Sequence, residues 1–143
     1  MDTEELYNAL ANLYEKAQVE SYGVDIIEIG VLSLQEVSDI QQKIDKNLQD
    51  FKKIIRFSET RHIAKMHGKQ HERVSGQIQI EVEHFIQIPE LIKNYDTITF
   101  QPKNHKARKY KDSILFEKGS YSIVFDINFG SRELTLKTMW VKK

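Results

Sequence analysis

The C-terminal third of the chain alternates strand-like runs with glycine turns, and this pattern constrains the fold more than any other feature. Runs rich in β-branched and aromatic residues predict strands at 97–101, 113–118, 120–128 and 132–141. Gly119 and Gly130 separate the last three runs, where tight turns are needed. The pattern predicts an antiparallel meander, which requires helices on one face to bury its apolar side chains.

Helices are predicted ahead of the meander. Residues 3–19 follow a D-x-x-E start signal and repeat leucines at helical spacing. Ser33 and Glu36 form a capping box for a second helix, whose predicted apolar stripe runs from Leu34 to Leu48. A strand is predicted between them at 24–32. Shorter helices are predicted at 58–66, with Ser58 as N-cap, and at 82–87 and 89–94.

Residues 51–57 fit either a strand or a continuation of the second helix, because the run is too short to show a period. Taken together, the elements predict an α+β fold, with N-terminal helices packed on one face of a C-terminal four-stranded antiparallel sheet. An acidic helical N-terminal region, 1–50, and a sheet-bearing domain, 51–143, are expected to form one compact unit.

The net charge of zero hides an asymmetry along the chain. Residues 1–50 carry 11 Asp and Glu against 3 Lys and Arg, whereas residues 51–143 carry 10 against 18. This split favours an anionic ligand on the C-terminal part, although two mutually neutralising surfaces would give the same counts. The absence of Cys excludes disulfides and thiol catalysis. With an acidic N-terminus and no apolar run near the ~20 residues that span a bilayer, a cytoplasmic protein without a membrane partner is expected.

The predicted helix at 58–66 carries the titratable groups that best fit catalysis. On a helical wheel, His62 and His67 flank a stripe predicted to be buried, formed by Ile63 and Met66. A partly shielded imidazole can titrate near neutrality and transfer protons, and His62 is the stronger candidate. Lys65 and Arg61 lie on the outer side, free to meet a phosphate. The alternative is that both histidines are boundary residues with hydrogen-bonded rings.

No metal site and no cofactor are expected. His67 and His71 have i, i+4 spacing, but Gly68 between them would break the helix that such a pair requires. No third ligand stands at a suitable spacing.

The loop Lys103–Lys111 (K-N-H-K-A-R-K-Y-K) has five Lys and Arg, no acid and one Tyr. Such a loop can contact a phosphate backbone and stack on a base, although a merely solvated loop is the alternative. On the last strand, strict alternation places Thr138 with Leu134, Leu136 and Trp140 on the apolar, helix-covered face. A hydroxyl there requires a partner or a ligand.

From Phe51 to Trp140 the chain resembles the phage-type branch of the barnase–EndoU–colicin–RelE-like (BECR) nuclease superfamily, compact α+β domains of phage, mobile-element and toxin proteins. The resemblance rests on R-H-I-A-K-M-H-G, on G-Q-I-Q-I followed by F-I-Q-I-P-E-L-I-K-N-Y-D-T-I, and on the closing L-T-L-K-T. It implies metal-independent cleavage of RNA, often tRNA. A 2′,3′-cyclic phosphate and a 5′-hydroxyl are the expected products.

The resemblance also implies functional roles for specific residues of this sequence. His62 and His67 match the helix histidines, Arg73 and Gln77 match polar positions ahead of the sheet, and Tyr110 or Lys111, with Thr138, match strand positions. One departure is Val74-Ser75 before Gly76, where an Arg is expected. With the nearby cations added, the expected catalytic residues are His62, His67, Lys65, Arg73 and Thr138, and the expected substrate contacts are Arg61, Gln77, Lys109, Tyr110 and Lys111.

Three functional hypotheses follow. The first is a ribonuclease acting as a toxin or effector of a phage or mobile element inside a host bacterium, with an inhibitor or host protein as a further partner. The second is a catalytically silent phage accessory protein that binds nucleic acid or a host protein through its basic face. The third is a protein-interaction domain that uses its acidic N-terminal helix.

Overall fold

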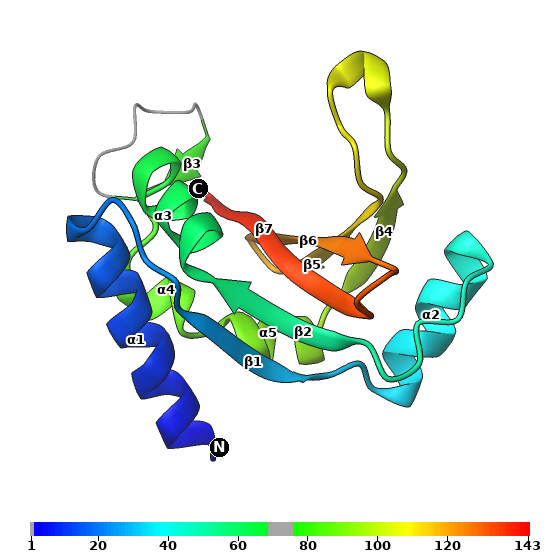
Figure 1. Cartoon of the computed structure of the whole chain (residues 1–143), viewed down its shortest axis with the longest axis horizontal. Helices are drawn as coiled ribbons and strands as arrows, with labels where there is room; N and C mark the ends of the chain where they lie inside the picture. Colours follow the sequence, from blue (N-terminus) through cyan, green and yellow to red (C-terminus); the bar gives the residue numbers. More distant parts are fainter. Residues whose placement is uncertain (1, 69–75) are drawn as a thin grey trace.

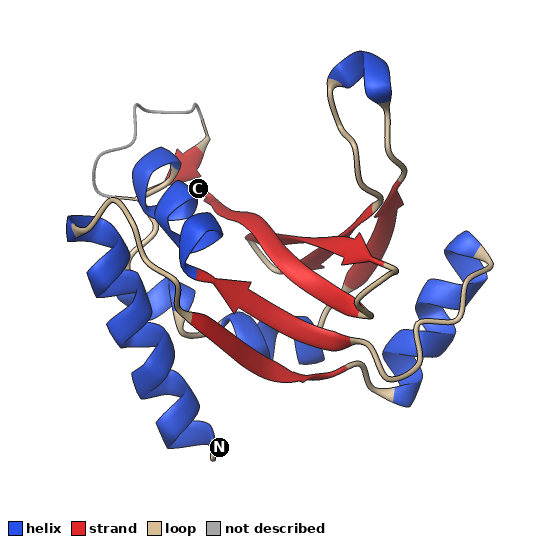
Figure 2. Ribbon diagram, viewed as in Figure 1, coloured by secondary structure: helices blue, strands red, loops and turns tan. Residues whose placement is uncertain are grey.

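The computed structural model describes residues 2–68 and 76–143. Within these ranges it forms one mixed sheet of seven strands with helices around it (Figures 1 and 2). The helices are α1 (Thr3–Val19), α2 (Leu34–Ile44), α3 (Phe57–Met66), α4 (Val82–Phe85), α5 (Ile88–Lys93) and the 3-10 turn η1 (His105–Ala107). The strands are β1 (Ile26–Val31), β2 (Lys52–Arg56), β3 (Gln77–Ile78), β4 (Thr97–Gln101), β5 (Ser113–Lys118), β6 (Tyr121–Asn128) and β7 (Glu133–Lys142).

The sheet contains the predicted meander and three further strands. Its order is β1-β2-β7-β6-β5-β4, and β3 pairs with the far end of β7. The prediction of an α+β fold is confirmed, but the prediction of a four-stranded sheet is wrong. Residues 52–56, which fitted either helix or strand, form β2, and β2 runs parallel to β7. All other strand pairs among the described residues are antiparallel.

Local capping signals define the two longest helices. The side chain of Asp2 accepts a hydrogen bond from the Glu5 amide at the start of α1. Ser33 and Glu36 form the predicted capping box of α2. However, α2 ends at Ile44, and Leu34 is 81% exposed rather than part of the buried stripe. As the first residue of α2, Leu34 lies at the edge of the surface that packs on the sheet.

A single hydrophobic core joins the helices to the sheet. It includes Leu10 of α1 and Ile40 of α2 together with Ile55 of β2 and the apolar side chains of the meander. The core therefore draws on both the predicted N-terminal region, 1–50, and the rest of the chain. The Tyr14 hydroxyl of α1 donates to the Ile80 carbonyl at 2.8 Å, and its ring stacks on Phe85 of α4. This contact fixes α1 against the segment that follows β3.

A buried ion pair attaches α2 to the sheet. Lys53 Nζ of β2 lies 3.0 Å from Glu36 Oε1, and their side chains are 8% and 2% exposed. The same Glu36 oxygen accepts from the Ser33 amide in the capping box. The pair therefore connects the start of α2 to the second strand.

We expect Lys53→Met to lower the free energy of unfolding by about 3–5 kcal/mol, because it leaves the Glu36 carboxylate buried without its cation. The double variant Lys53→Met/Glu36→Gln should regain most of this loss, since a neutral Gln can still accept from the Ser33 amide. Urea denaturation followed by circular dichroism measures both values. A single variant that loses less than about 1 kcal/mol would show that the pair is not structurally important.

Candidate active site on the polar face of the sheet

The strand register assigns each side chain of the meander to one of two faces, because directly paired residues point to the same side. On one side, two neighbouring rows consist of apolar residues that pack against the core: Phe100, Ile114, Phe125 and Leu136 in one row and Ile98, Phe116, Ile123 and Met139 in the next. Helix α5 covers this side through the buried Ile88 and Ile92. Figure 2 shows α4 and α5 behind the sheet.

The opposite side is rich in hydrogen-bonding side chains, and we call it the polar face. Its rows consist of Gln101, Ser113, Asp126 and Thr135; of Thr99, Leu115, Val124 and Thr138; and of Thr97, Glu117, Ser122 and Trp140. In Figure 1, α3 and β3 lie at one end of β7, and the segment between β4 and β5 rises at the opposite side. We call this segment, residues 102–112, the arm.

A β-bulge in β7 places Thr138 on the polar face. Val124 pairs with Thr138, whereas the next residue, Phe125, pairs with Leu136, so Lys137 is an extra residue in β7. The prediction that Thr138 and Trp140 share the apolar face is wrong, because it assumed strict alternation along the strand. Met139 takes the buried position instead and is fully buried.

The charges of three lysines act on the carboxylate of Asp126. Burial raises the pKa of Asp126, and the charges of Lys137, Lys111 and Lys109 act in the opposite direction. The charge of Glu59, in the first turn of α3, makes a smaller contribution that raises this pKa further. Burial also lowers the pKa of Lys109, and the charge of Lys137 lowers it further. The pKa of Asp126 is raised and the pKa of Lys109 is lowered, so both values move toward neutral pH.

Hydrogen bonds hold two of these lysines in place. Lys111 Nζ donates to Asn128 Oδ1 at 2.8 Å, and Asn128 Nδ2 donates in turn to Thr135 Oγ1 at 2.8 Å. Lys109 Nζ donates to Gln101 Oε1 at 3.3 Å. The base of the arm is therefore connected to the polar face through side chains on β4, β6 and β7.

The polar face also holds buried atoms with unused hydrogen-bonding capacity. Ser113 Oγ, Asp126 Oδ1 and Thr138 Oγ1 have no hydrogen-bond partner among the described residues. A buried polar atom costs free energy unless it is satisfied, so these atoms are suited to contacts with a polar ligand. Two hydroxyls can donate to a ligand oxygen, and the lysines beside them can balance a negative charge.

Helix α3 differs from the helical-wheel prediction in where it begins and in which side chains it buries. It begins at Phe57, one residue earlier than predicted, and Ser58 bonds to the side chain of Glu59 instead of capping the helix. Ile63 is buried as predicted, but Met66 is 49% exposed, because Ala64 takes the buried position beside Ile63. His62 and Lys65 are both exposed.

His67 and Gln77, predicted separately from the helix and from the segment ahead of the sheet, meet in space. His67 Nδ1 lies 3.1 Å from Gln77 Oε1, so Nδ1 carries the proton in this contact. The His67 carbonyl accepts from the Ile80 amide at 2.6 Å. Since β3 pairs with the far end of β7, this histidine lies at the end of the sheet next to α3.

Arg61 has a structural partner. Its Nη1 donates to the carbonyls of Ala17 and Gln18 at 2.7 and 3.3 Å, which satisfies the last turn of α1. The prediction that Arg61 is free to meet a phosphate is therefore wrong. Arg73, predicted as catalytic, and His71 lie outside the described residues.

Sequence inspection missed Asp126, Lys137, Asn128, Thr135 and Ser113. A signal was present, since three successive strands carry small polar or acidic residues at alternate positions: Ser113 in β5, Ser122 and Asp126 in β6, and Thr135 in β7. The convergence of Ser113, Asp126 and Thr135 in one row depends on strand register, which the sequence does not show.

Within this α+β fold, the polar face thus carries a buried carboxylate influenced by three lysine charges, together with buried hydroxyls without a hydrogen-bond partner among the described residues. Residues 33–143 match the family model described as phage-Barnase-EndoU-ColicinE5/D-RelE like nuclease3, so the chain belongs to this family of nucleases. The match begins within the predicted N-terminal region and includes α3, the arm and the polar face. No curated protein and no solved structure matches the chain.

Two further features bear on the class of site. Within residues 2–68 and 76–143, no group of three or more His, Cys, Asp or Glu side chains is arranged to hold a metal ion. Across the same part of the chain, no helix is both long enough and apolar enough to cross a membrane.

We expect Asp126→Asn to raise the urea midpoint at pH 7. A raised pKa means that the folded state binds the Asp126 proton more tightly than the unfolded state. The stability linked to that proton is present in acid and is lost as pH rises through the folded-state pKa. The gain from Asn should shrink as pH falls toward 4 and vanish below it, where the wild-type carboxyl is itself protonated.

Asp45→Asn serves as the control, because Asp45 is an exposed carboxyl at the end of α2. It should change the midpoint little at either pH. An Asp126→Asn midpoint equal to or below that of the wild-type protein at pH 7 would contradict the assignment of a desolvated carboxylate.

Proposed function

We propose that this protein is a metal-independent endoribonuclease that holds the scissile phosphodiester of tRNA or another RNA on the polar face. The observation that carries the proposal is the group of Lys109, Lys111 and Lys137 around Asp126, beside buried hydroxyls, in a chain of a nuclease family.

The proposed reaction uses the substrate's own nucleophile. The 2′-hydroxyl oxygen attacks phosphorus, the bond from phosphorus to the 5′-oxygen breaks, and a 2′,3′-cyclic phosphate and a 5′-hydroxyl result. A base accepts the proton of the 2′-hydroxyl, and an acid donates a proton to the departing 5′-oxygen. Cations and hydroxyls around phosphorus stabilise the additional negative charge of the transition state.

Asp126 and His62 are the two groups that we assign to proton transfer. Burial brings the pKa of Asp126 closer to neutrality, which suits a carboxylate acting as a base. His62 lies one helical turn after Glu59, whose charge reaches Asp126, so His62 is on a similar side of α3. His67 is the alternative to His62, and its contact with Gln77 would hold the ring in position.

The remaining residues bind the phosphate. Lys109, Lys111 and Lys137 supply positive charge, and the hydroxyls of Thr138 and Ser113 donate to its oxygens. Lys65 is exposed on α3 and can add charge from that side. Arg73 keeps the phosphate-binding role that the family resemblance implies. As a nuclease of a phage-type family, the protein would act on host RNA as a toxin or effector, with an inhibitor protein to restrain it.

Incubation of the protein with total tRNA in EDTA tests the activity directly. We expect cleavage products that end in a 2′,3′-cyclic phosphate, detected by their conversion to 2′- and 3′-phosphates in acid. Intact RNA, or cleavage that requires added magnesium, would falsify the proposal. Salt-sensitive RNA binding without turnover would instead favour the silent binding protein.

Variants of the polar face then test the roles. Lys137→Gln should lower kcat about 10²–10³-fold by removing charge at the phosphate. Asp126→Asn and His62→Gln should each lower it about 10²–10⁴-fold by removing a proton-transfer group. Lys43→Gln, an exposed change of the same charge on α2, is the matched control and should leave kcat unchanged.

Melting temperatures measured in parallel separate catalysis from folding. Asp126→Asn is the sharpest case, since it should gain stability at pH 7 while losing activity. If the His62→Gln variant is fully active, the proton-transfer role belongs to His67 instead. The His67→Gln variant should then be inactive.

A further inference from the structure

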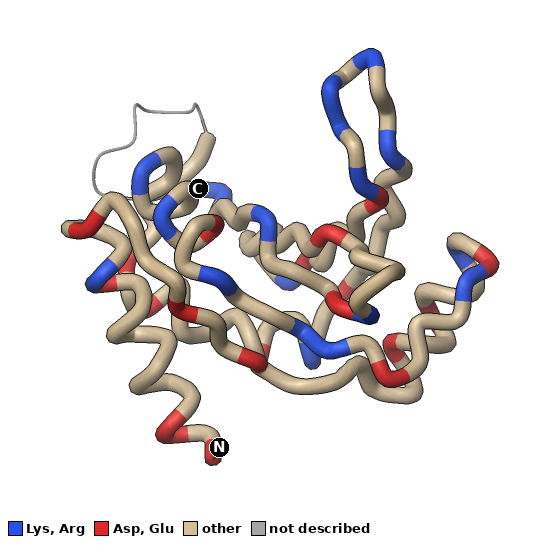
Figure 3. The backbone as a smooth tube through the Cα atoms, in the orientation of Figure 1, with Lys and Arg blue, Asp and Glu red and all other residues tan. Residues whose placement is uncertain are grey.

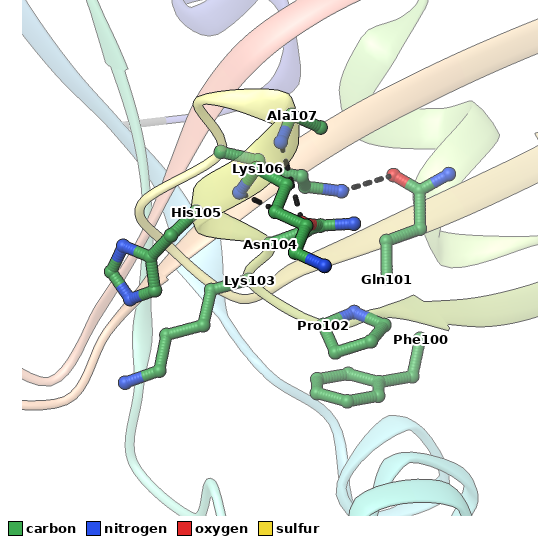
Figure 4. Close-up of a pocket in the computed structure, with 9 residues that line it drawn as sticks. Phe100, Gln101, Pro102, Lys103, Asn104, His105, Lys106 and Ala107 are labelled. Atoms are coloured by element: carbon green, nitrogen blue, oxygen red, sulfur yellow. Dashed lines mark hydrogen bonds between the residues drawn. The ribbon is translucent and has the colours of Figure 1, made fainter.

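The arm contains a cavity that the proposed reaction does not use. Its volume is about 670 Å³, and it is lined by Phe100, Gln101, Pro102, Lys103, Asn104, His105, Lys106, Ala107 and Lys109 (Figure 4). Phe100 and Pro102 present their rings at one end, and the side chains of Lys103 and His105 extend from the other. The lining thus combines flat apolar surfaces with cations, which is the composition that binds a nucleotide.

Hydrogen bonds within the arm hold the cavity in shape. The side chain of Asn104 accepts from the amides of Lys106 and Ala107 at 3.1 and 3.3 Å. The backbones of Asn104 and Lys109 exchange two hydrogen bonds, of 2.7 and 2.9 Å. The Lys103 amide donates to Asp112 at the base of the arm. A segment ordered in this way loses less entropy when a ligand binds.

The cations of the arm are available to a ligand. Figure 3 shows Lys and Arg along both sides of the arm. Lys103, Lys106 and Arg108 are exposed, and no ion pair within the described residues involves any of them. Exposed cations that form no ion pair can attract a phosphate backbone.

The cavity borders the polar face at strand β4. Gln101 and Lys109 both line it, and Gln101 belongs to the row of Ser113 and Asp126, whereas Phe100 lines the cavity from the apolar side of the same strand. Lys109 acts on the pKa of Asp126 as well as bonding to Gln101. An RNA strand whose phosphodiester lies beside Asp126 would reach the cavity by passing Gln101 at the edge strand β4.

We propose that the cavity of the arm is a subsite for a nucleotide flanking the scissile phosphodiester of a single RNA strand. The base stacks against Phe100 and Pro102, and Lys103 and Lys106 hold the adjoining phosphate. His105, whose ring lies 5.7 Å from that of Tyr110, closes the other end. This inference rests on the proposed function for the identity of the strand, but nucleotide binding by the arm can be measured without cleavage.

The first experiment is an NMR titration of the full chain with 5′-AMP and, separately, with ribose 5-phosphate. We expect 5′-AMP to shift the ring signals of Phe100 and His105, and ribose 5-phosphate to leave the Phe100 ring unchanged. No response to either compound would overturn the subsite. Equal responses to both would show a phosphate site only and would overturn base binding.

The second experiment measures binding of a labelled 2′-O-methyl RNA 10-mer, which cannot be cleaved, by fluorescence anisotropy. Phe100→Leu should weaken binding about 5- to 100-fold by removing one stacked base while retaining apolar bulk. Lys103→Gln/Lys106→Gln should lower the slope of log Kd against log salt by about 1.4, because each phosphate that a lysine no longer neutralises lowers it by about 0.7. Lys43→Gln/Lys46→Gln on α2 carries the same charge change and should leave the slope unaltered.

Cleavage assays then distinguish the two proposals. The paired arm variant should raise KM for tRNA about 10-fold with kcat unchanged, because the arm binds substrate away from the reacting atoms. An unchanged KM in an active enzyme would overturn the arm subsite alone. An inactive wild-type protein that still binds 5′-AMP at the arm would overturn the ribonuclease and leave the subsite.

Discussion

The one-residue register shift in the middle of β7 is the constraint on which the candidate site depends. Before the shift, alternate residues such as Leu134 and Leu136 face the core; after it, Met139 and Val141 do so. Lys137 is the extra residue of the bulge, so it adds a side chain to β7 without displacing an apolar side chain from the core. As a result, a lysine and a threonine lie together on the polar face, where a regular strand would supply only one side chain.

The electrostatics of the site follow from its position on a sheet that is buried on one side only. The Asp126 carboxylate of β6 is desolvated by burial, yet the charges of lysines on β7 and in the arm act on it. The charge asymmetry of the sequence is also visible along the backbone. Most acidic residues of the first fifty belong to α1, α2 and β1, while the arm carries Lys and Arg along both of its sides (Figure 3).

Elements with strong local signals were predictable from the sequence, and long-range pairings were not. The bounds of α1, β4 and β5 agree with the predictions, because capping residues, leucine spacing and strand composition act within a few residues. The parallel pairing of β2 with β7 and the two-residue strand β3 depend on partners far along the chain. For the site, Lys109, Lys111 and Thr138 were selected as candidates, whereas Asp126 was not, because its significance comes from neighbours on three other segments.

The central position of β7 also bears on how the molecule is made. This strand lies between β2 and β6, and it is synthesised after both, so neither the sheet nor the row from Gln101 to Thr135 can close until β7 leaves the ribosome. Non-local strand pairing of this kind forms late in folding. A nascent or truncated chain would lack Thr135, Lys137 and Thr138 and could not assemble a complete site. The strand that completes the sheet is therefore also the strand that completes the polar face.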